Sequence, residues 1–153
     1  VNLHNRATEL VPGLIIAGLG GSLPTKFKKD GENDWIDVFN PYPYLTEVDY
    51  TAAVKALWTE KVQPLINEDK SVILMTHDGP QDYYTANARG TINWPAIGFH
   101  KFGSIGLAEL ISEERSKLVV HIHGHCHDGG FLDRVQCDQG LHSFPVLNPG
   151  SLN

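Results

Sequence analysis

The sequence predicts one domain of the α/β class. Three short apolar runs, at residues 13–17, 71–76 and 118–120, each end in a glycine-rich or polar turn, as buried strands do. Two segments between these runs repeat apolar residues at helical spacing. Strand, helix, strand, helix, strand is the order of an α/β fold. The chain of 153 residues, of which 41% are hydrophobic, is long enough for a packed core, and we expect residues 1–153 to form a single domain.

The charge and the cysteine content exclude several classes of protein. The formal net charge is −6 and no basic run occurs, which argues against a broad surface for nucleic acid or for an anionic membrane. A phosphorylated substrate stays compatible with this charge, because bound metal ions invert the local charge. Two cysteines are too few for a disulfide framework. No signal peptide and no membrane-spanning run is visible, so we expect a cytoplasmic location and no membrane partner.

The N-terminal segment carries one clear strand. Residues 2–6 are a candidate edge strand, and residues 13–17 are a buried one. The glycine-rich residues 18–22 lack the Gly-Lys pair of a P-loop, and the third glycine of the dinucleotide fingerprint is replaced by Leu23. We interpret them as a loop near the active face, with N–H groups that are candidates for phosphate contact. Residues 23–45 predict a long surface loop whose aromatic side chains either pin it to the core or line a pocket.

A helix is predicted from residue 46 to about residue 65. Thr46 is the expected N-cap, and Glu47 and Asp49 place acids in the first turn. Pro64 is expected to end or kink the helix. The apolar face that would pack on a sheet consists of Tyr50, Val54, Leu57, Trp58, Val62 and Leu65.

His77 follows the strand at residues 71–76 directly. Ligands gather at the carboxyl ends of parallel strands, which makes His77 a candidate metal ligand, with a turn-capping histidine as the alternative. Asp78 stands before a Gly-Pro pair, so we rank a turn role first and a metal role second. The polar loop at residues 81–99 contains Arg89, a candidate to bind a substrate phosphate, with a solvated arginine as the alternative. A second helix is predicted from residue 104 to about residue 113.

The stretch at residues 121–130 holds four of the eight histidines of the chain. Its glycines allow the backbone to kink, so that neighbouring imidazoles can diverge toward two ions. Neutral imidazole is the commonest metal ligand and suits zinc, manganese and iron. We predict that His125 and His127 are metal ligands, and that His121 and His123 lie on the strand, in the core or where they orient a ligand. A histidine-rich strand end without metal is the alternative.

Three strand ends together resemble the calcineurin-like metallophosphoesterases. Thr76-His77-Asp78-Gly79-Pro80, the Gly-His-x-His motif at residues 124–127 and Asn-Pro-Gly-Ser at residues 148–151 are similar to the last motifs of that family, in its order. Gly103-Ser104 before a short helix also fits, although residues 148–151 alone make a sufficient turn. The resemblance implies an α/β fold that is part of a two-sheet sandwich flanked by helices. It also implies two divalent metal ions, such as Mn, Zn or Fe, with His77 and His125 binding one ion and His127 the other.

The earlier motifs of that family do not occur in this sequence. No Asp is followed two positions later by His, and there is no Gly-Asp pair and no Asn-His pair. In the family these motifs supply the bridging carboxylate, the second carboxylate, an Asn ligand and the histidine that protonates the leaving group. We therefore leave the catalytic residues unassigned and interpret the chain as the C-terminal part of a phosphoesterase domain, truncated at its N-terminus.

The function we predict is metal-dependent hydrolysis of a phosphate ester by a dinuclear site in the complete parent domain. The substrate would be a small or protein phosphoester. One alternative is a non-catalytic scaffold or interaction fragment that keeps the phosphoesterase fold, but such a chain would have lost His77, His125 and His127, which are intact. A small structural zinc protein is the weakest alternative, because the cysteines are too few.

Overall fold

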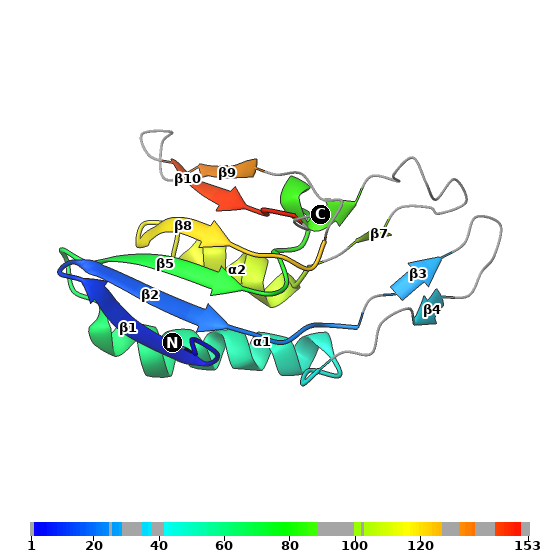
Figure 1. The fold of residues 1–153 in the computed structure, drawn as a ribbon, viewed down its shortest axis with the longest axis horizontal. Helices are drawn as coiled ribbons and strands as arrows, with labels where there is room; N and C mark the ends of the chain where they lie inside the picture. The colour runs from blue at the N-terminus through cyan, green and yellow to red at the C-terminus, as the bar shows by residue number, and fades with distance from the viewer. Residues whose placement is uncertain are drawn as a thin grey trace.

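The computed structural model describes residues 2–24, 26–28, 35–37, 42–88, 100–101, 103–126, 132–136 and 143–150. These residues form a mixed six-stranded sheet and two α-helices, which confirms the α/β class (Figure 1). The strand order across the sheet is β1-β2-β5-β8-β10-β9. In that order the strands are β1 (Arg6–Val11), β2 (Leu14–Leu19), β5 (Ser71–Thr76), β8 (Leu118–Ile122), β10 (Ser143–Leu147) and β9 (Leu132–Gln136).

The four central strands run parallel, and the two edge strands run antiparallel to their neighbours. Ile16 of β2 pairs with Ile73 of β5, which in turn pairs with Val120 of β8. Because parallel strands end at the same edge of a sheet, the residues that follow β5, β8 and β10 meet at one edge. The three stretches singled out in the sequence all follow these strands.

Helix α1 (Glu47–Ala56) begins as its sequence predicts. The side chain of Thr46 caps it by accepting a hydrogen bond of 3.2 Å from the N–H of Asp49. The helical path continues through a π-helical segment, η1 (Leu57–Val62), and a 3₁₀ turn, η2 (Gln63–Leu65), which contains Pro64. The predicted end near residue 65 is therefore confirmed, but the hydrogen-bonding pattern changes along the way.

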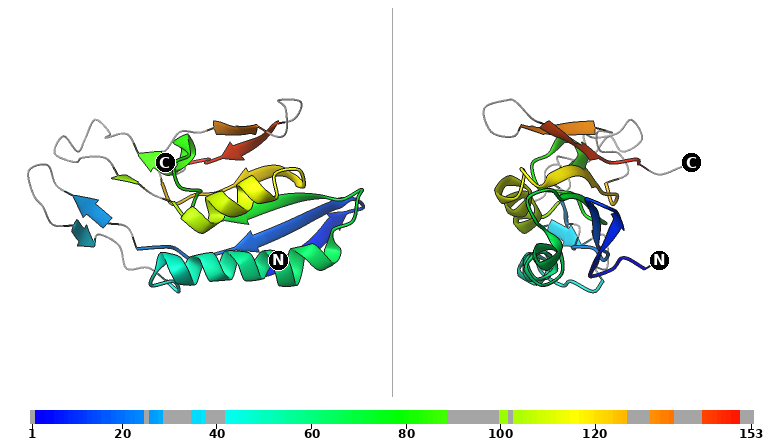
Figure 2. Two further views of the ribbon diagram at one scale, coloured as in Figure 1. Left: turned by 180° about the vertical axis from the view of Figure 1, so that it is seen from behind. Right: turned by 90° about the vertical axis from the view of Figure 1, so that its left-hand side faces the viewer.

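Both α-helices lie on the same face of the sheet (Figure 2). Helix α2 (Ile105–Glu113) is capped by Ser104 and packs against α1. On the sheet face toward the helices, Ile15, Leu74 and Val146 are fully buried in the main hydrophobic cluster. The alternating residues point to the opposite face, and there apolar side chains are only partly buried: Ile16, Ile73, Val120 and Ile122.

The expectation of a long surface loop at residues 23–45 is wrong in part, because part of it forms strands. Strand β3 (Lys26–Lys28) pairs antiparallel with β4 (Trp35–Asp37). Strands of three residues are too short to produce an alternating pattern that can be recognised in sequence. A second small pair, β6 (Asn87–Ala88) with β7 (His100–Lys101), follows the 3₁₀ turn η3 (Tyr84–Ala86). No helix in the described part of the chain is long and apolar enough to cross a membrane.

Candidate functional site

His77 lies at the carboxyl end of β5 and joins three segments of backbone. Its N–H donates to the carbonyl of Leu19 at 3.2 Å, and its own carbonyl accepts from the N–H of Gly124 at 2.9 Å. The end of β5 is thereby tied to the end of β2 on one side and to the turn after β8 on the other. The imidazole of His77 is exposed, so a ligand can reach it.

His125 follows β8 in a tight turn and faces His77. Its backbone has φ of 62°, in the left-handed region that residues other than glycine seldom adopt. Nδ1 of His125 lies 3.2 Å from Nε2 of His77, and the two rings meet edge to face with centroids 5.1 Å apart. The structure thus brings together two residues that are 48 positions apart and that the sequence marked as ligands.

The spacing of these two nitrogens fits one metal ion. Two imidazole nitrogens that bind a tetrahedral zinc ion lie about 3.3–3.4 Å apart, since each Zn–N bond is about 2.0–2.1 Å. The 3.2 Å between the nitrogens of His77 and His125 is close to that value, and an N–H···N hydrogen bond gives the same spacing. Among the residues described, no group of three or more His, Cys, Asp or Glu side chains is arranged to hold a metal. His77 and His125 therefore fit as two ligands of a metal ion, and further ligands would be needed to complete the site.

Two of the predicted site residues have no described position. His127, the second histidine of the Gly-His-x-His motif, and Arg89, the candidate phosphate ligand, both lie outside the residues that the structure describes. Their assigned roles stay predictions from the sequence.

Asp78 anchors a turn, the role that the sequence analysis ranked first, and its second carboxyl oxygen lies near His125. Its side chain is 1% exposed, and Oδ2 accepts a hydrogen bond of 2.7 Å from the N–H of Leu23, which anchors the turn after β2. Oδ1 lies 3.5 Å from Nδ1 of His125 and has no hydrogen-bond partner within the described residues. Burial raises the pKa of Asp78 to about 7, against the effect of the Leu23 N–H and with a smaller contribution from the charge of Glu47.

His121 and His123 form a second, buried pair. Their rings stack with centroids 5.4 Å apart, and the residues are 0% and 2% exposed. The hydroxyl of Thr76 donates to the carbonyl of Asp78 at 2.5 Å, so it accepts from Nε2–H of His121 at 2.8 Å. Burial, aided by the neighbouring His123, lowers the pKa of His121 well below its ordinary value. This ring is a neutral part of the core, which agrees with the predicted placement.

The tautomer of His123 also follows from its partners. Nδ1 lies 3.0 Å from the carbonyl oxygen of Gly124, which can only accept, so Nδ1 carries the proton. Nε2 then accepts from the hydroxyl of Thr85 at 2.9 Å. Burial lowers the pKa of His123, opposed by the bond to Gly124 and aided by His77. Both nitrogens are occupied, so His123 supports the loop of His125 rather than binding an ion.

Asn148 does more than the plain turn expected of it. Oδ1 accepts from the N–H of Gly150 at 3.0 Å, which is the turn contact that the sequence indicates. The side-chain amide also donates to the carbonyls of Thr85 at 2.8 Å and Cys126 at 2.6 Å. The residue is 2% exposed. Its position after a parallel strand, at the edge where β5 and β8 also end, was the signal that could have indicated this role.

Glu47 holds the beginning of α2. This acid stands in the first turn of α1 as the sequence predicts, and its Oε1 also accepts from the hydroxyl of Ser104 at 2.7 Å and from the N–H of Gly106 at 3.1 Å. The base of the segment between β5 and α2 is closed nearby, because the N–H of Ser104 donates to Gly79 and the N–H of Gln81 donates to Ser104, both at 2.9 Å. The turn that contains His77 is thus fixed to both helices.

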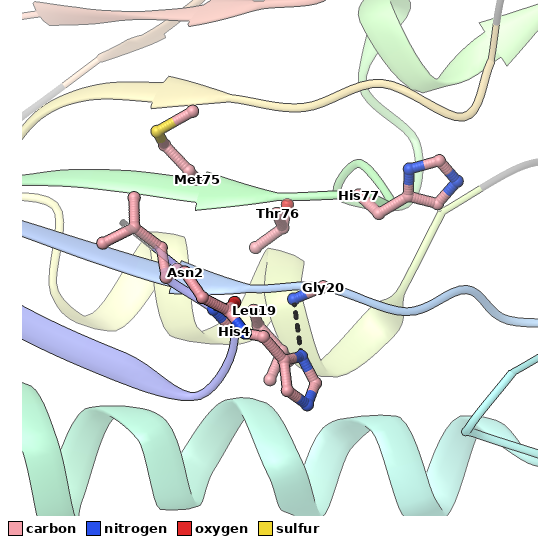
Figure 3. A pocket seen from close by; sticks show the side chains of 9 residues that line it. Asn2, His4, Leu19, Gly20, Met75, Thr76 and His77 are labelled. Carbon is pink, nitrogen blue, oxygen red and sulfur yellow. Dashed lines mark hydrogen bonds between the residues drawn. The ribbon is translucent and has the colours of Figure 1, made fainter.

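An open pocket of about 320 Å³ lies at the carboxyl ends of β2 and β5, beside the N-terminal segment (Figure 3). His4 contributes one wall, where its Nδ1 accepts from the N–H of Gly20 at 3.1 Å. His77 lies at the end of β5 on the same pocket. The pocket is lined by Asn2, Leu3, His4, Gly18, Leu19, Gly20, Met75, Thr76 and His77.

Comparisons with known proteins establish the fold alone. No protein-family model matches the chain, and no curated protein matches it. A solved structure is similar to it at 18% sequence identity with a TM-score of 0.53. The alignment covers 97% of this chain and 45% of that chain, so this chain spans about half the length of the solved structure that it matches. At this identity the likeness supports the α/β architecture and carries no functional assignment.

Proposed function

We propose that this chain is part of a metal-dependent phosphoesterase, in which His77, His125 and His127 bind divalent ions and Arg89 contacts the phosphate of a small or protein phosphoester. The observation that carries the proposal is the 3.2 Å between Nδ1 of His125 and Nε2 of His77. Two imidazoles from separate strand ends, facing each other at the spacing of two ligands of one ion, are an arrangement that suits a metal site.

The described side chains would have distinct tasks at this site. His77 and His125 would present nitrogen lone pairs to an ion, and the buried carboxyl group of Asp78, 3.5 Å from His125, would add negative charge next to it once deprotonated. Divalent ions supply Lewis-acid stabilisation of phosphoryl oxygens and make bound water more acidic. Two cations held close together need bridging carboxylates, which we propose come from residues other than those described.

We also propose that the sheet is one half of a two-sheet sandwich. Helices cover one face of it, while the opposite face carries the partly buried side chains of Ile16, Ile73, Val120 and Ile122. A row of aliphatic side chains across three neighbouring strands is the kind of surface that packs against a second sheet. This finer description of the fold rests on the resemblance and on that apolar face.

Metal content per chain is the first test of the proposed function. The purified chain is loaded with Mn²⁺ or Zn²⁺, desalted and analysed by elemental mass spectrometry, alongside His125→Ala. The matched control is His4→Ala, which removes an exposed imidazole next to the same pocket. We expect bound metal in the parent chain and in His4→Ala, and its loss in His125→Ala. Hydrolysis of p-nitrophenyl phosphate and of its bis-ester then distinguishes monoesterase from diesterase activity.

Two results would change the proposal. Equal metal content in the parent chain and in His125→Ala would contradict the assignment of the histidine pair. The second result is metal bound through His125 without hydrolysis of either ester, both by this chain and by the complete parent domain. That result would favour the scaffold function instead.

A further inference from the structure

We propose that Asn148 is a positioning residue, whose side-chain amide holds the turn of His125 so that Nδ1 of His125 faces Nε2 of His77. This inference rests on the proposed function, because metal binding is the purpose assigned to the facing nitrogens of His77 and His125. Asn148 follows β10 and is not among the predicted metal ligands. The turn expected at residues 148–151 uses its side-chain oxygen and does not explain the two bonds that its side-chain NH₂ group donates.

The turn around His125 needs an external restraint. A histidine with φ of 62° is in a conformation that glycine adopts more readily, so surrounding contacts have to favour it. Locally, the N–H of Cys126 donates to the carbonyl of Gly124 at 2.8 Å, across His125. This short-range bond closes the turn but does not fix where the turn lies relative to β5.

Asn148 supplies the missing connection on the far side of the turn. Its Nδ2 donates at 2.6 Å to the carbonyl of Cys126, the residue directly after His125. On the near side, the N–H of Gly124 is bonded to the carbonyl of His77 at 2.9 Å. His125 is therefore held on both flanks, by His77 before it and by Asn148 after it.

The amide of Asn148 is itself fixed and cannot easily point elsewhere. Its second proton bonds to the carbonyl of Thr85 at 2.8 Å, and its Oδ1 accepts from Gly150. The hydroxyl of Thr85 reaches Nε2 of His123, which lies two positions before His125. Asn148 and Thr85 thus join the turn of His125 at two points. An amide is suited to this task, because it alone among side chains of this size donates two bonds and accepts one.

The test compares Asn148→Ala with a control variant that should lower the stability of the fold by a similar amount. Phe144→Leu shortens a buried side chain near the start of β10, four residues before Asn148 and away from the carboxyl end of the strand. The first measurement is the nuclear Overhauser effect between the ring protons of His77 and His125 in the metal-free chain. We expect it in the parent chain and in Phe144→Leu, and we expect it to be lost in Asn148→Ala.

The second measurement is the affinity for Zn²⁺ by calorimetry, with Zn²⁺ alone as the probe. Loss of a group that orients a ligand weakens metal binding by about 10–100-fold, so we expect that range for Asn148→Ala and an unchanged affinity for Phe144→Leu. If Asn148→Ala does not fold, Thr85→Val replaces it, since that change removes only the hydroxyl bond to His123 and should weaken Zn²⁺ binding in the same direction.

The two readouts separate failure of the inference from failure of the proposed function. If the ring-to-ring contact and the affinity both persist in Asn148→Ala, the positioning role is wrong even if the chain binds metal. If the parent chain shows no Zn²⁺ binding but the contact is lost in Asn148→Ala alone, the positioning geometry stands and the metal function falls.

Discussion

Four histidines at the carboxyl edge of the sheet form two pairs that differ in ring geometry, burial and hydrogen-bond partners. His77 and His125 meet edge to face, with ring nitrogens 3.2 Å apart and one ring exposed. His121 and His123 stack in the core, with hydrogen bonds to threonine hydroxyls. The same residue type is therefore found in two different settings at one edge of the sheet, one pair packed in the core and the other at the strand ends with one ring exposed.

The difference teaches that the partners of an imidazole are a better guide to its role than its place in a motif. A buried histidine with one ring nitrogen bonded to Thr76 or Thr85 has a lowered pKa and acts as a polar part of the core. His77 and His125 instead face each other with ring nitrogens 3.2 Å apart, which is the arrangement on which the proposed metal site rests. Loss of each pair should therefore have a different consequence.

The largest expected effect is on stability, and it separates the two pairs. His121→Ala should lower the free energy of unfolding by about 2–4 kcal/mol, because it leaves a cavity at a fully buried site. His77→Ala should change it by no more than about 0.5 kcal/mol, because the ring is exposed. Urea denaturation of both variants in EDTA at pH 7 measures this. Similar losses in the two variants would remove the distinction drawn between the pairs.

A change beside the buried pair should have the next largest effect. A Cβ at Gly79 would lie 2.7 Å from Nδ1 of His123, which is packed and cannot move away freely. Gly79→Ala should therefore cost about 1–3 kcal/mol through overpacking. Gly20→Ala is the control, since its Cβ would lie 3.3 Å from Nδ1 of the exposed His4. Thermal unfolding of the two variants should rank Gly79→Ala well below Gly20→Ala, and the reverse order would mean that the ring of His123 is not packed as described.

The smallest effect is the dependence of stability on pH. Burial keeps His121 neutral in the folded chain, whereas the unfolded chain binds a proton there below about pH 6.5. The unfolded state then holds more protons, so stability rises with pH up to about 6.5, by as much as about 1.4 kcal/mol per pH unit for this group, and is level above it. His121→Gln should flatten this slope, with the stacked His123 accounting for what is left. A slope that is unchanged in His121→Gln would show that another group titrates.

The sequence predicted the elements that depend on long regular patterns. The three parallel strands near His77, His125 and Asn148, the cap at Thr46 and the end of the first helical segment near Pro64 were all expected and are present. The meeting of His77 with His125 could also be expected, because parallel strands end at one edge. What could not be expected were contacts between side chains and distant backbone, such as the bonds from Asn148 to Cys126 and from Ser104 to Glu47. These contacts depend on the packing of the whole chain and produce no periodic pattern in the sequence.

The closed base between β5 and α2 makes the intervening stretch a natural place for variation. Gly79, Gln81 and Ser104 hold its two ends together with backbone hydrogen bonds, and Thr85 within it is bonded to His123 and Asn148, so residues inserted between 88 and 100 would move neither β5 nor α2. Doubling the length of a flexible loop costs only about 0.6 kcal/mol in closure entropy. Residues inserted there would therefore cost the fold little. An engineer would choose this stretch for an inserted reporter or a new recognition loop.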